Sequence, residues 1–300
     1  MNSVYAWNRK LRRRWTLPIK LLPILLVILT AGLYTASAQT LRDVGLDQPI
    51  QSGTATTFRT LVQQVLPDLT VDGKAEHTGY VRDGWLVSDA SVYPGRFDLV
   101  KLDAAWIKTP TGRLLVLFLK LEGESNQTLP WGELALLAIF RITPQLKLLD
   151  SVDVGGNRIT TFYGTLPIQR NAEAVIVEYE YRNPEGLEYR HFSVLQISED
   201  GVGGLFSEFP YLLYGQSSST ELSETGEFSS VPNGRSKHRD LIFTVNTAVN
   251  TYAADGLTIL RTRFQMFRLR AVWKRGRYRY ADGGVAMRRL DATRRQAGFD

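Results

Sequence analysis

The 300-residue chain contains 36 Lys and Arg, 30 Asp and Glu, three His and no Cys, which gives a net charge of +6. Without cysteine the chain forms no disulfides, and thiolate catalysis, iron–sulfur clusters and sulfur-based zinc sites are excluded. Six basic residues and no acidic residue lie in residues 1–38, so the rest of the chain is neutral, which argues against a dedicated nucleic-acid binder.

The N-terminus has the pattern of a secretory signal peptide. A basic segment, Arg9–Arg14, precedes a mostly apolar stretch, Leu21–Leu33, and small residues follow. This order, with Ala36 and Ala38 forming an A-x-A site, predicts cleavage before Gln39. The protein is therefore expected to be exported, to the bacterial periplasm or out of the cell.

Two alternatives to a cleaved signal of the general secretory route remain open. Residues 17–34 reach the lower length limit for a membrane-spanning helix, and without cleavage they would anchor the protein in the inner membrane. Lys20 and two prolines disfavour that reading. The pair Arg13-Arg14 permits a twin-arginine signal, although the residues after the pair depart from the expected context.

Residues 39–77 are expected to form a polar lead-in and one short helix. Apolar residues recur at helical spacing on one face, at Phe58, Leu61, Val62, Val65 and Leu66. Thr56 or Thr57 is placed to cap the start of this helix, and Pro67 ends it.

Residues 78–300 are expected to form a single β-rich domain. β-Branched and aromatic runs alternate with turn signals such as Asp-Gly, and we count about ten to twelve strands. Short connections between them predict an all-β, mainly antiparallel meander and exclude a parallel βαβ architecture. Both a propeller-like closure and a two-sheet sandwich remain open, since no blade-length repeat recurs.

Several strands are clear from pattern alone. Thr109–Gly112 predicts a hairpin turn, and the strand after it, Arg113–Leu121, is apolar on both faces and should be central and covered. The pattern of Trp131–Ile142 permits either helix or strand. Ala172–Tyr181 alternates as a half-buried strand and opens a second hairpin with Leu187–Ile197.

Residues 215–238 depart from this pattern of strands and turns. They contain seven serines and only three large apolar residues, so they bury too little surface to offset the entropy of ordering. We expect a flexible loop there, either a disordered insertion or a functional lid.

Charge is strongly segregated towards the C-terminus. Residues 261–300 have a net charge of +9, whereas residues 39–260 have a net charge of −9. A basic hairpin turning at Gly276 interleaves cations with aromatic rings, which suits an anionic ligand; the candidate ligand-binding residues are Arg270, Trp273, Lys274, Arg275, Arg277, Tyr278, Arg279 and Tyr280. The alternative is internal pairing of this hairpin with an acidic sheet. The final segment, with Arg288-Arg289 and Arg294-Arg295, is expected to fray.

No catalytic motif is present. The chain has no nucleophile elbow, phosphate-binding glycine loop or calcium loop, and His77, His191 and His238 do not have metal-ligand spacing. Glu178 and Glu180 share a strand face and are the best carboxylate pair for a glycosidase. An exposed polar face explains that pair equally well.

These patterns favour an exported, non-enzymatic binding or scaffolding module of the envelope that needs no cofactor. Its expected partners are an anionic polysaccharide, a lipid or an envelope protein, with no nucleic acid, and with the membrane touched only through an uncleaved N-terminus. Two alternatives remain: a secreted glycan hydrolase whose carboxylates meet only in the fold, and a component tethered to an inner-membrane assembly.

Overall fold

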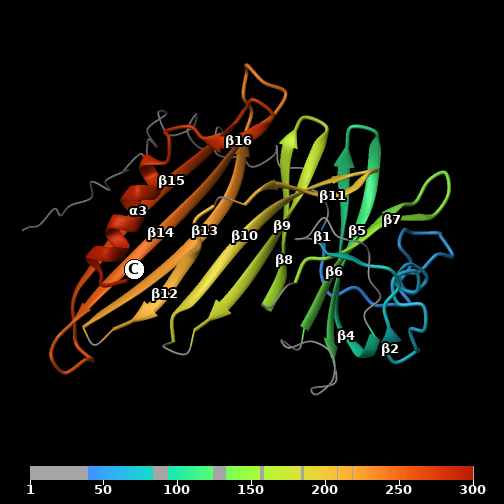
Figure 1. Ribbon diagram of the computed structural model, residues 1–300, viewed down its shortest axis with the longest axis horizontal. Helices are drawn as coiled ribbons and strands as arrows, with labels where there is room; N and C mark the ends of the chain where they lie inside the picture. Colours follow the sequence, from blue (N-terminus) through green and yellow to red (C-terminus); the bar gives the residue numbers. More distant parts are fainter. Residues whose placement is uncertain are drawn as a thin grey trace, which may run out of the picture. The chain divides into compact units, whose positions relative to one another are not determined.

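The computed structural model describes residues 40–83, 94–123, 133–155, 159–183, 186–207, 209–217 and 219–299. All of them belong to one compact unit, Ser37–Asp300, built mainly from antiparallel strands as predicted (Figure 1). The predicted signal peptide, its cleavage site and the alternative anchor at residues 17–34 lie outside the described residues. In the described part, no helix is long and apolar enough to cross a membrane.

The strands form two sheets, so the two-sheet alternative describes this fold and the propeller does not. The first sheet has the strand order β1-β4-β5-β6-β7-β3, with β2 paired to β4. Only β3 and β7 run parallel. The bounds are β1 Thr40–Leu41, β2 Lys74–His77, β3 Arg82–Asp83, β4 Pro94–Thr109, β5 Gly112–Gly123, β6 Glu133–Arg141 and β7 Lys147–Asp153.

The second sheet has the order β16-β15-β14-β13-β12-β10-β9-β8, with the short strand β11 paired to β10. Its bounds are β8 Ile159–Gln169, β9 Ala172–Arg182, β10 Glu188–Ser198, β11 Gly201–Phe206, β12 Leu212–Gln216, β13 Thr220–Val231, β14 Asp240–Tyr252, β15 Ile259–Lys274 and β16 Arg277–Tyr280. Two helices accompany the sheets, α2 at Phe58–Val62 and α3 at Val285–Gln296.

Strand β5 confirms the prediction of a central, covered strand. Its alternate side chains enter two different cores, Leu115 and Leu117 on one face and Val116 and Phe118 on the other. All four are at most 1 % exposed. The predicted turn at Thr109–Gly112 also forms, and the ambiguous segment after β5 becomes strand β6, whose alternate residues join the same two cores.

The two sheets share a packed core. Residues of β4 to β7 lie in one apolar cluster with Phe162 of β8, Val175 and Val177 of β9 and Ile197 of β10. Strand β9 is therefore covered on both faces over its first half, because Ile176 on its other face is also buried. The prediction of a half-buried strand is wrong there: the second sheet has a further core behind β9.

That further core forms because the second sheet curls. The edge strand β8 approaches β13 and β14, since Arg239 N–H donates to the Ile168 carbonyl over 2.8 Å and the Tyr163 hydroxyl donates to the Gly226 carbonyl over 3.2 Å. Inside the curl, rings from four segments pack at centroid distances between 4.4 and 5.5 Å, namely Phe192, Phe209, Phe228 and Phe243.

Helix α2 forms where the apolar spacing predicted a helix, but it ends at Val62 rather than at Pro67. The predicted apolar face is nevertheless buried as far as Leu66, because turns continue the chain against the first sheet. Thr57 occupies the N-cap position without a capping hydrogen bond.

The prediction of a loop at residues 215–238 is wrong in its middle, where β13 runs as a twelve-residue strand paired along its whole length with β14. Leu222, Glu224 and Phe228 share the face that points into the curl, while Ser223 and Ser229 share the outer face. Ser223 and Ser229 thus lie on an uncovered sheet face, whereas Ser230 lies on the other face and accepts from the Arg239 guanidinium. Main-chain pairing with β14 along the whole strand, and with β12 at residues 221–223, supplies the order that apolar burial alone could not.

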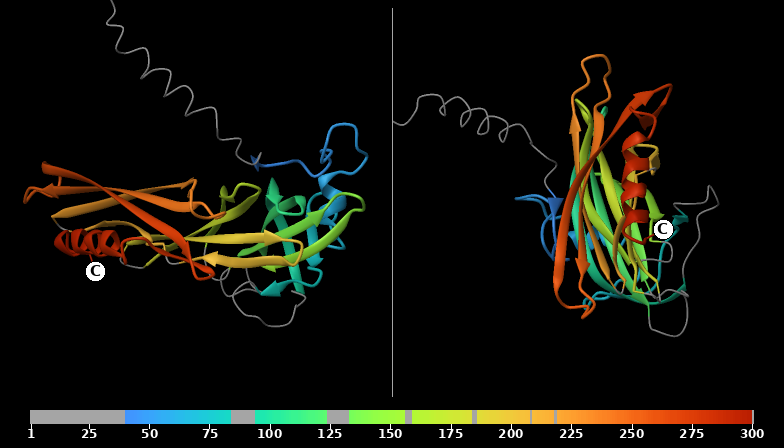
Figure 2. Two further views of the ribbon diagram at one scale, coloured as in Figure 1. Left: turned by 90° about the horizontal axis from the view of Figure 1, so that it is seen from above. Right: turned by 90° about the vertical axis from the view of Figure 1, so that its left-hand side faces the viewer.

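The prediction of a frayed C-terminal segment is also wrong. Residues 285–296 form helix α3, which packs over β15 inside the curl (Figure 2). Leu290 is fully buried, and Arg294 is 3 % exposed. The Arg294 guanidinium pairs with Glu224 over 2.6 Å and donates to the Tyr211 carbonyl, so this basic side chain anchors the helix.

Candidate functional site

The predicted basic hairpin forms from β15 and β16, which turn through Arg275 and Gly276 at positive φ angles of 51° and 81°. Lys274 lies directly opposite Arg277, and Val272 lies opposite Arg279. Since directly opposed residues point to the same side of a sheet, four cations gather on one face. We call Arg270, Lys274, Arg277 and Arg279 the basic face.

The basic face is largely free of internal partners. Arg270 pairs with Asp240, a fully buried carboxylate that also accepts from the Asn233 amide over 2.9 Å. Among the described residues, Lys274, Arg277 and Arg279 make no hydrogen bond or ion pair through their side chains, and all three are exposed. Pairing with an acidic sheet therefore accounts for Arg270 alone.

The aromatic residues of the hairpin lie on its other face and serve the fold. The Trp273 ring stacks on His238 at a centroid distance of 3.9 Å. The Tyr278 hydroxyl donates to the Arg239 carbonyl over 2.9 Å, and burial, with the charge of Asp240 adding to it, raises the Tyr278 pKa far above its usual value. Tyr280 packs edge-on against Phe206. The rings are therefore not open stacking platforms.

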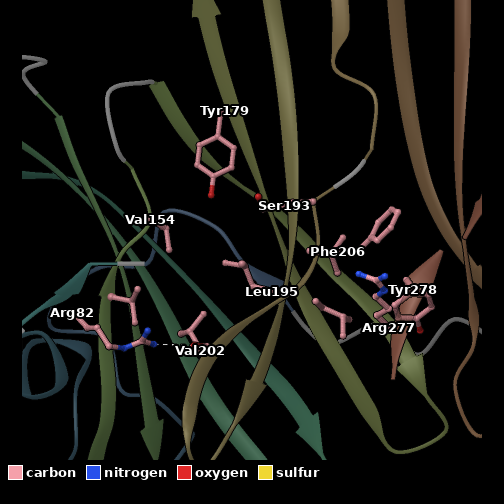
Figure 3. Close-up of a pocket in the computed structure, with 14 residues that line it drawn as sticks. Arg82, Val154, Tyr179, Ser193, Leu195, Val202, Phe206, Arg277 and Tyr278 are labelled. Carbon is pink, nitrogen blue, oxygen red and sulfur yellow. Dashed lines mark hydrogen bonds between the residues drawn. The ribbon is translucent and has the colours of Figure 1, made fainter. Parts of the chain in front are cut away.

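A pocket of about 300 Å³ lies where β16 meets β11 and the first sheet. Its walls are mostly apolar, with Val154, Leu195, Val202 and Phe206 among them, and Ser193 adds a hydroxyl (Figure 3). Two arginines line it from opposite sides, Arg82 and Arg277. The structure thus brings Arg277 and Tyr278 of the predicted site together with residues far away in the sequence.

Arg82 has hydrogen-bond partners of its own, which hold the pocket walls together. Its guanidinium donates to the Asp150 carboxylate over 2.7 Å and to the Val202 carbonyl over 2.8 Å. The same carboxylate oxygen accepts from the Val202 main-chain N–H over 2.9 Å. These bonds tie β11 to β7, and Gly201 is required beside them because its φ is 115° and a Cβ would collide with Asp150.

Arg277 differs from Arg82 because its side chain has no partner within the described ranges. A guanidinium that reaches an apolar pocket without a carboxylate offers two parallel donors to an acid group. Lys274, directly opposite Arg277 in the strand pair, adds a second positive charge next to it, outside the pocket lining. The arrangement can therefore hold an anionic group at the rim while an apolar portion enters the pocket.

No sequence pattern predicted Arg82, Asp150 or Ser193 as pocket residues, because they come together only in the fold. Asp200-Gly201 carries the one local signal, a turn, and it marks where β11 begins. Strand β11 is short and glycine-rich, so its pattern alone did not predict that it would form a wall.

The carboxylate pair is a weaker site. Burial raises the Glu178 pKa, Arg190 opposes that rise, and the charges of Glu180 and Glu188 add to it. Glu188 is held between Arg182 and Arg190 at 2.9 and 2.7 Å. All three acids thus have cationic neighbours, since Arg190 acts on Glu178 and Glu180 lies 3.9 Å from Arg182.

The histidines lie in three separate places. His77 contacts Asp68 at 3.1 Å, His191 packs near Tyr211, and His238 stacks on Trp273. Burial lowers the His238 pKa, as does Lys237. Within the described ranges, no group of three His, Asp or Glu side chains is arranged to bind a metal ion.

Comparison with known proteins finds no matching family model, no matching curated protein and no matching solved structure. The basic face and its pocket are therefore the features of the molecule that indicate a function.

Proposed function

We propose that this protein is an exported, non-enzymatic binding module of the cell envelope that holds an amphipathic anion. The observation that carries the proposal is the unpaired Arg277 at the rim of an apolar pocket, with Lys274 directly opposite. Like charges that face each other across a strand pair destabilise the sheet. A bound phosphate or carboxylate would neutralise both.

The pocket favours an acid group joined to an apolar chain. Its volume is at the lower end of the range for small-molecule sites, and its walls are mainly aliphatic and aromatic. An anionic lipid or a lipid-linked glycan has this chemistry. A purely polar polyanion would use the basic face and leave the pocket empty.

Calorimetric titration with decyl phosphate tests the proposal on the chain purified from Gln39 onwards. Binding is expected for the native chain, and Arg277→Gln should weaken it at least about tenfold, because a charge-assisted hydrogen bond to an ionised group is lost. Arg295→Gln is the matched control, since Arg295 is an exposed arginine of α3 with no side-chain partner among the described residues. Its affinity should be unchanged.

Two results would contradict this function. The first is absence of any binding to decyl phosphate. The second is equal binding of decyltrimethylammonium, which would show that the apolar chain alone is recognised. If a sulfated polysaccharide binds and decyl phosphate does not, the basic face would remain the proposed binding surface and the pocket would not be part of it.

A further inference from the structure

Strand β15 is paired on one side along almost its whole length and on the other side only at its end. β14 pairs with it as far as Ala271. β16, which is the last strand of the sheet, pairs only with residues 271–274. In the part of the chain that the structure describes, residues 261–269 have no strand partner on the side away from β14. We call this segment the free edge.

The orientation of the free edge follows from its neighbours. The Arg270 carbonyl accepts from the Ala281 N–H over 2.8 Å, just past β16, and Lys274 pairs with Arg277 across the two-residue turn. Because main-chain groups point alternately to the two sides of a strand, the even-numbered residues face outwards. Unused donors and acceptors are therefore presented by Thr262, Phe264, Met266 and Arg268.

Residues 261–269 have none of the prolines, lysines or bulges that often blunt an edge strand, and their charge comes from arginines. Natural edges are blunted by prolines, bulges, lysines or short length. Here Phe264 and Met266 are 77 % and 69 % exposed, next to each other on the outer face. A second strand laid along β15 would cover part of both side chains.

The charge of the free edge indicates what kind of strand would bind to it. Arg261, Arg263 and Arg268 make no ion pair within the described ranges, and the Arg263 Nε is buried without a hydrogen-bond partner. The whole segment 261–300 has a net charge of +9. A second copy of this edge would bring the same positive charge, whereas an acidic strand would complement it.

We propose that the free edge binds an extended acidic segment of a partner protein as an added antiparallel strand. Main-chain hydrogen bonds to the even-numbered residues supply affinity, and alternate side chains supply specificity. The fitting segment has carboxylates opposite Arg261, Arg263 and Arg268 and apolar side chains opposite Phe264 and Met266. This surface is separate from the pocket, so the proposal does not depend on the amphipathic anion.

A capped peptide of sequence EIVTVETE places these groups in register, with its first residue opposite Arg268 and its last opposite Arg261. Fluorescence anisotropy on the chain from Gln39 onwards should show binding that weakens as salt is added. N-Methylation of the third and fifth residues, whose N–H groups would face β15, should weaken binding at least about tenfold. N-Methylation of the second and fourth residues should leave binding largely unchanged.

A charge exchange tests the side chains. The double variant Arg261→Glu/Arg263→Glu should lose the acidic peptide and gain a peptide of sequence EIVTVKTK, whose lysines replace the two facing glutamates. Arg295→Glu, an equal charge change per residue on an exposed position of α3, should alter neither affinity. Circular dichroism on each variant verifies that the strands are retained.

Three outcomes would overturn the proposal. An equal effect of both methylation patterns, whether a loss or none, would mean that main-chain hydrogen bonds to β15 do not hold the peptide. Disulfide cross-linking of Gln265→Cys chains to one another, in a protein otherwise free of cysteine, would assign the edge to a second copy. Failure to bind the peptide, together with binding of phosphatidylglycerol vesicles that Phe264→Ser abolishes, would assign it to a lipid surface.

Discussion

Strands β5 and β15 are both long antiparallel strands, yet they use their surfaces in opposite ways. β5 has a strand on each side and an apolar core against each face. β15 has α3 over one face, but its outer face is exposed and part of its edge is unpaired. Most of its arginines have no ion-pair partner in the part of the chain that the structure describes. The central side chains of β5 are buried in the fold, so binding is to be sought around β15.

The largest expected effect on stability comes from comparing a buried side chain of β5 with an exposed side chain of β15. Phe118→Ala removes a ring that is 1 % exposed in the shared core of the two sheets and should lower the free energy of unfolding by about 3–5 kcal/mol. Met266→Ala, on the exposed face of β15, should change it by less than about 0.5 kcal/mol. Urea unfolding measures both, and similar losses for the two variants would refute the contrast.

On the inner face of the second sheet, in contrast to the exposed outer face of β15, a charged pair is buried between α3 and β13. Arg294 and Glu224 are 3 % and 0 % exposed in their side chains. Arg294→Met leaves a buried carboxylate without its cation and should cost about 3 kcal/mol. Amide hydrogen exchange should show α3 losing protection first.

The double variant Arg294→Met/Glu224→Gln is the control for that pair. It removes both charges and should cost much less than the single change, because no unpaired charge remains buried. Equal costs for the single and double variants would mean that α3 is held by its apolar contacts alone.

The two strands also show how far the sequence can be read. The continuous apolar run of β5 predicts a covered strand without any tertiary information. Strand β13 could not be predicted in this way, since its serines look like a loop until the pairing with β12 and β14 is known. Polar composition alone did not distinguish an uncovered sheet face from a flexible segment.

The candidate site was predictable in part. The interleaving of cations and rings identified the hairpin, and its turn at Gly276 forms. The prediction that the rings bind a ligand did not take into account the alternation of side chains along a strand. This alternation directs Trp273 and Tyr278 towards the core. Helix α3 was missed because its buried arginine needs a carboxylate seventy positions away in the chain.

The smallest expected effect is also the most direct test of the central claim, that Lys274 and Arg277 of the basic face have no counterion among the described residues. Lys274→Gln removes one of two directly opposed cations. In low salt and without added anions, this variant should be more stable than the native chain by about 0.2–1 kcal/mol. Added decyl phosphate should stabilise the native chain more than the variant. A variant that is less stable than the native chain under the same conditions would show that Lys274 already has a partner and would contradict the claim.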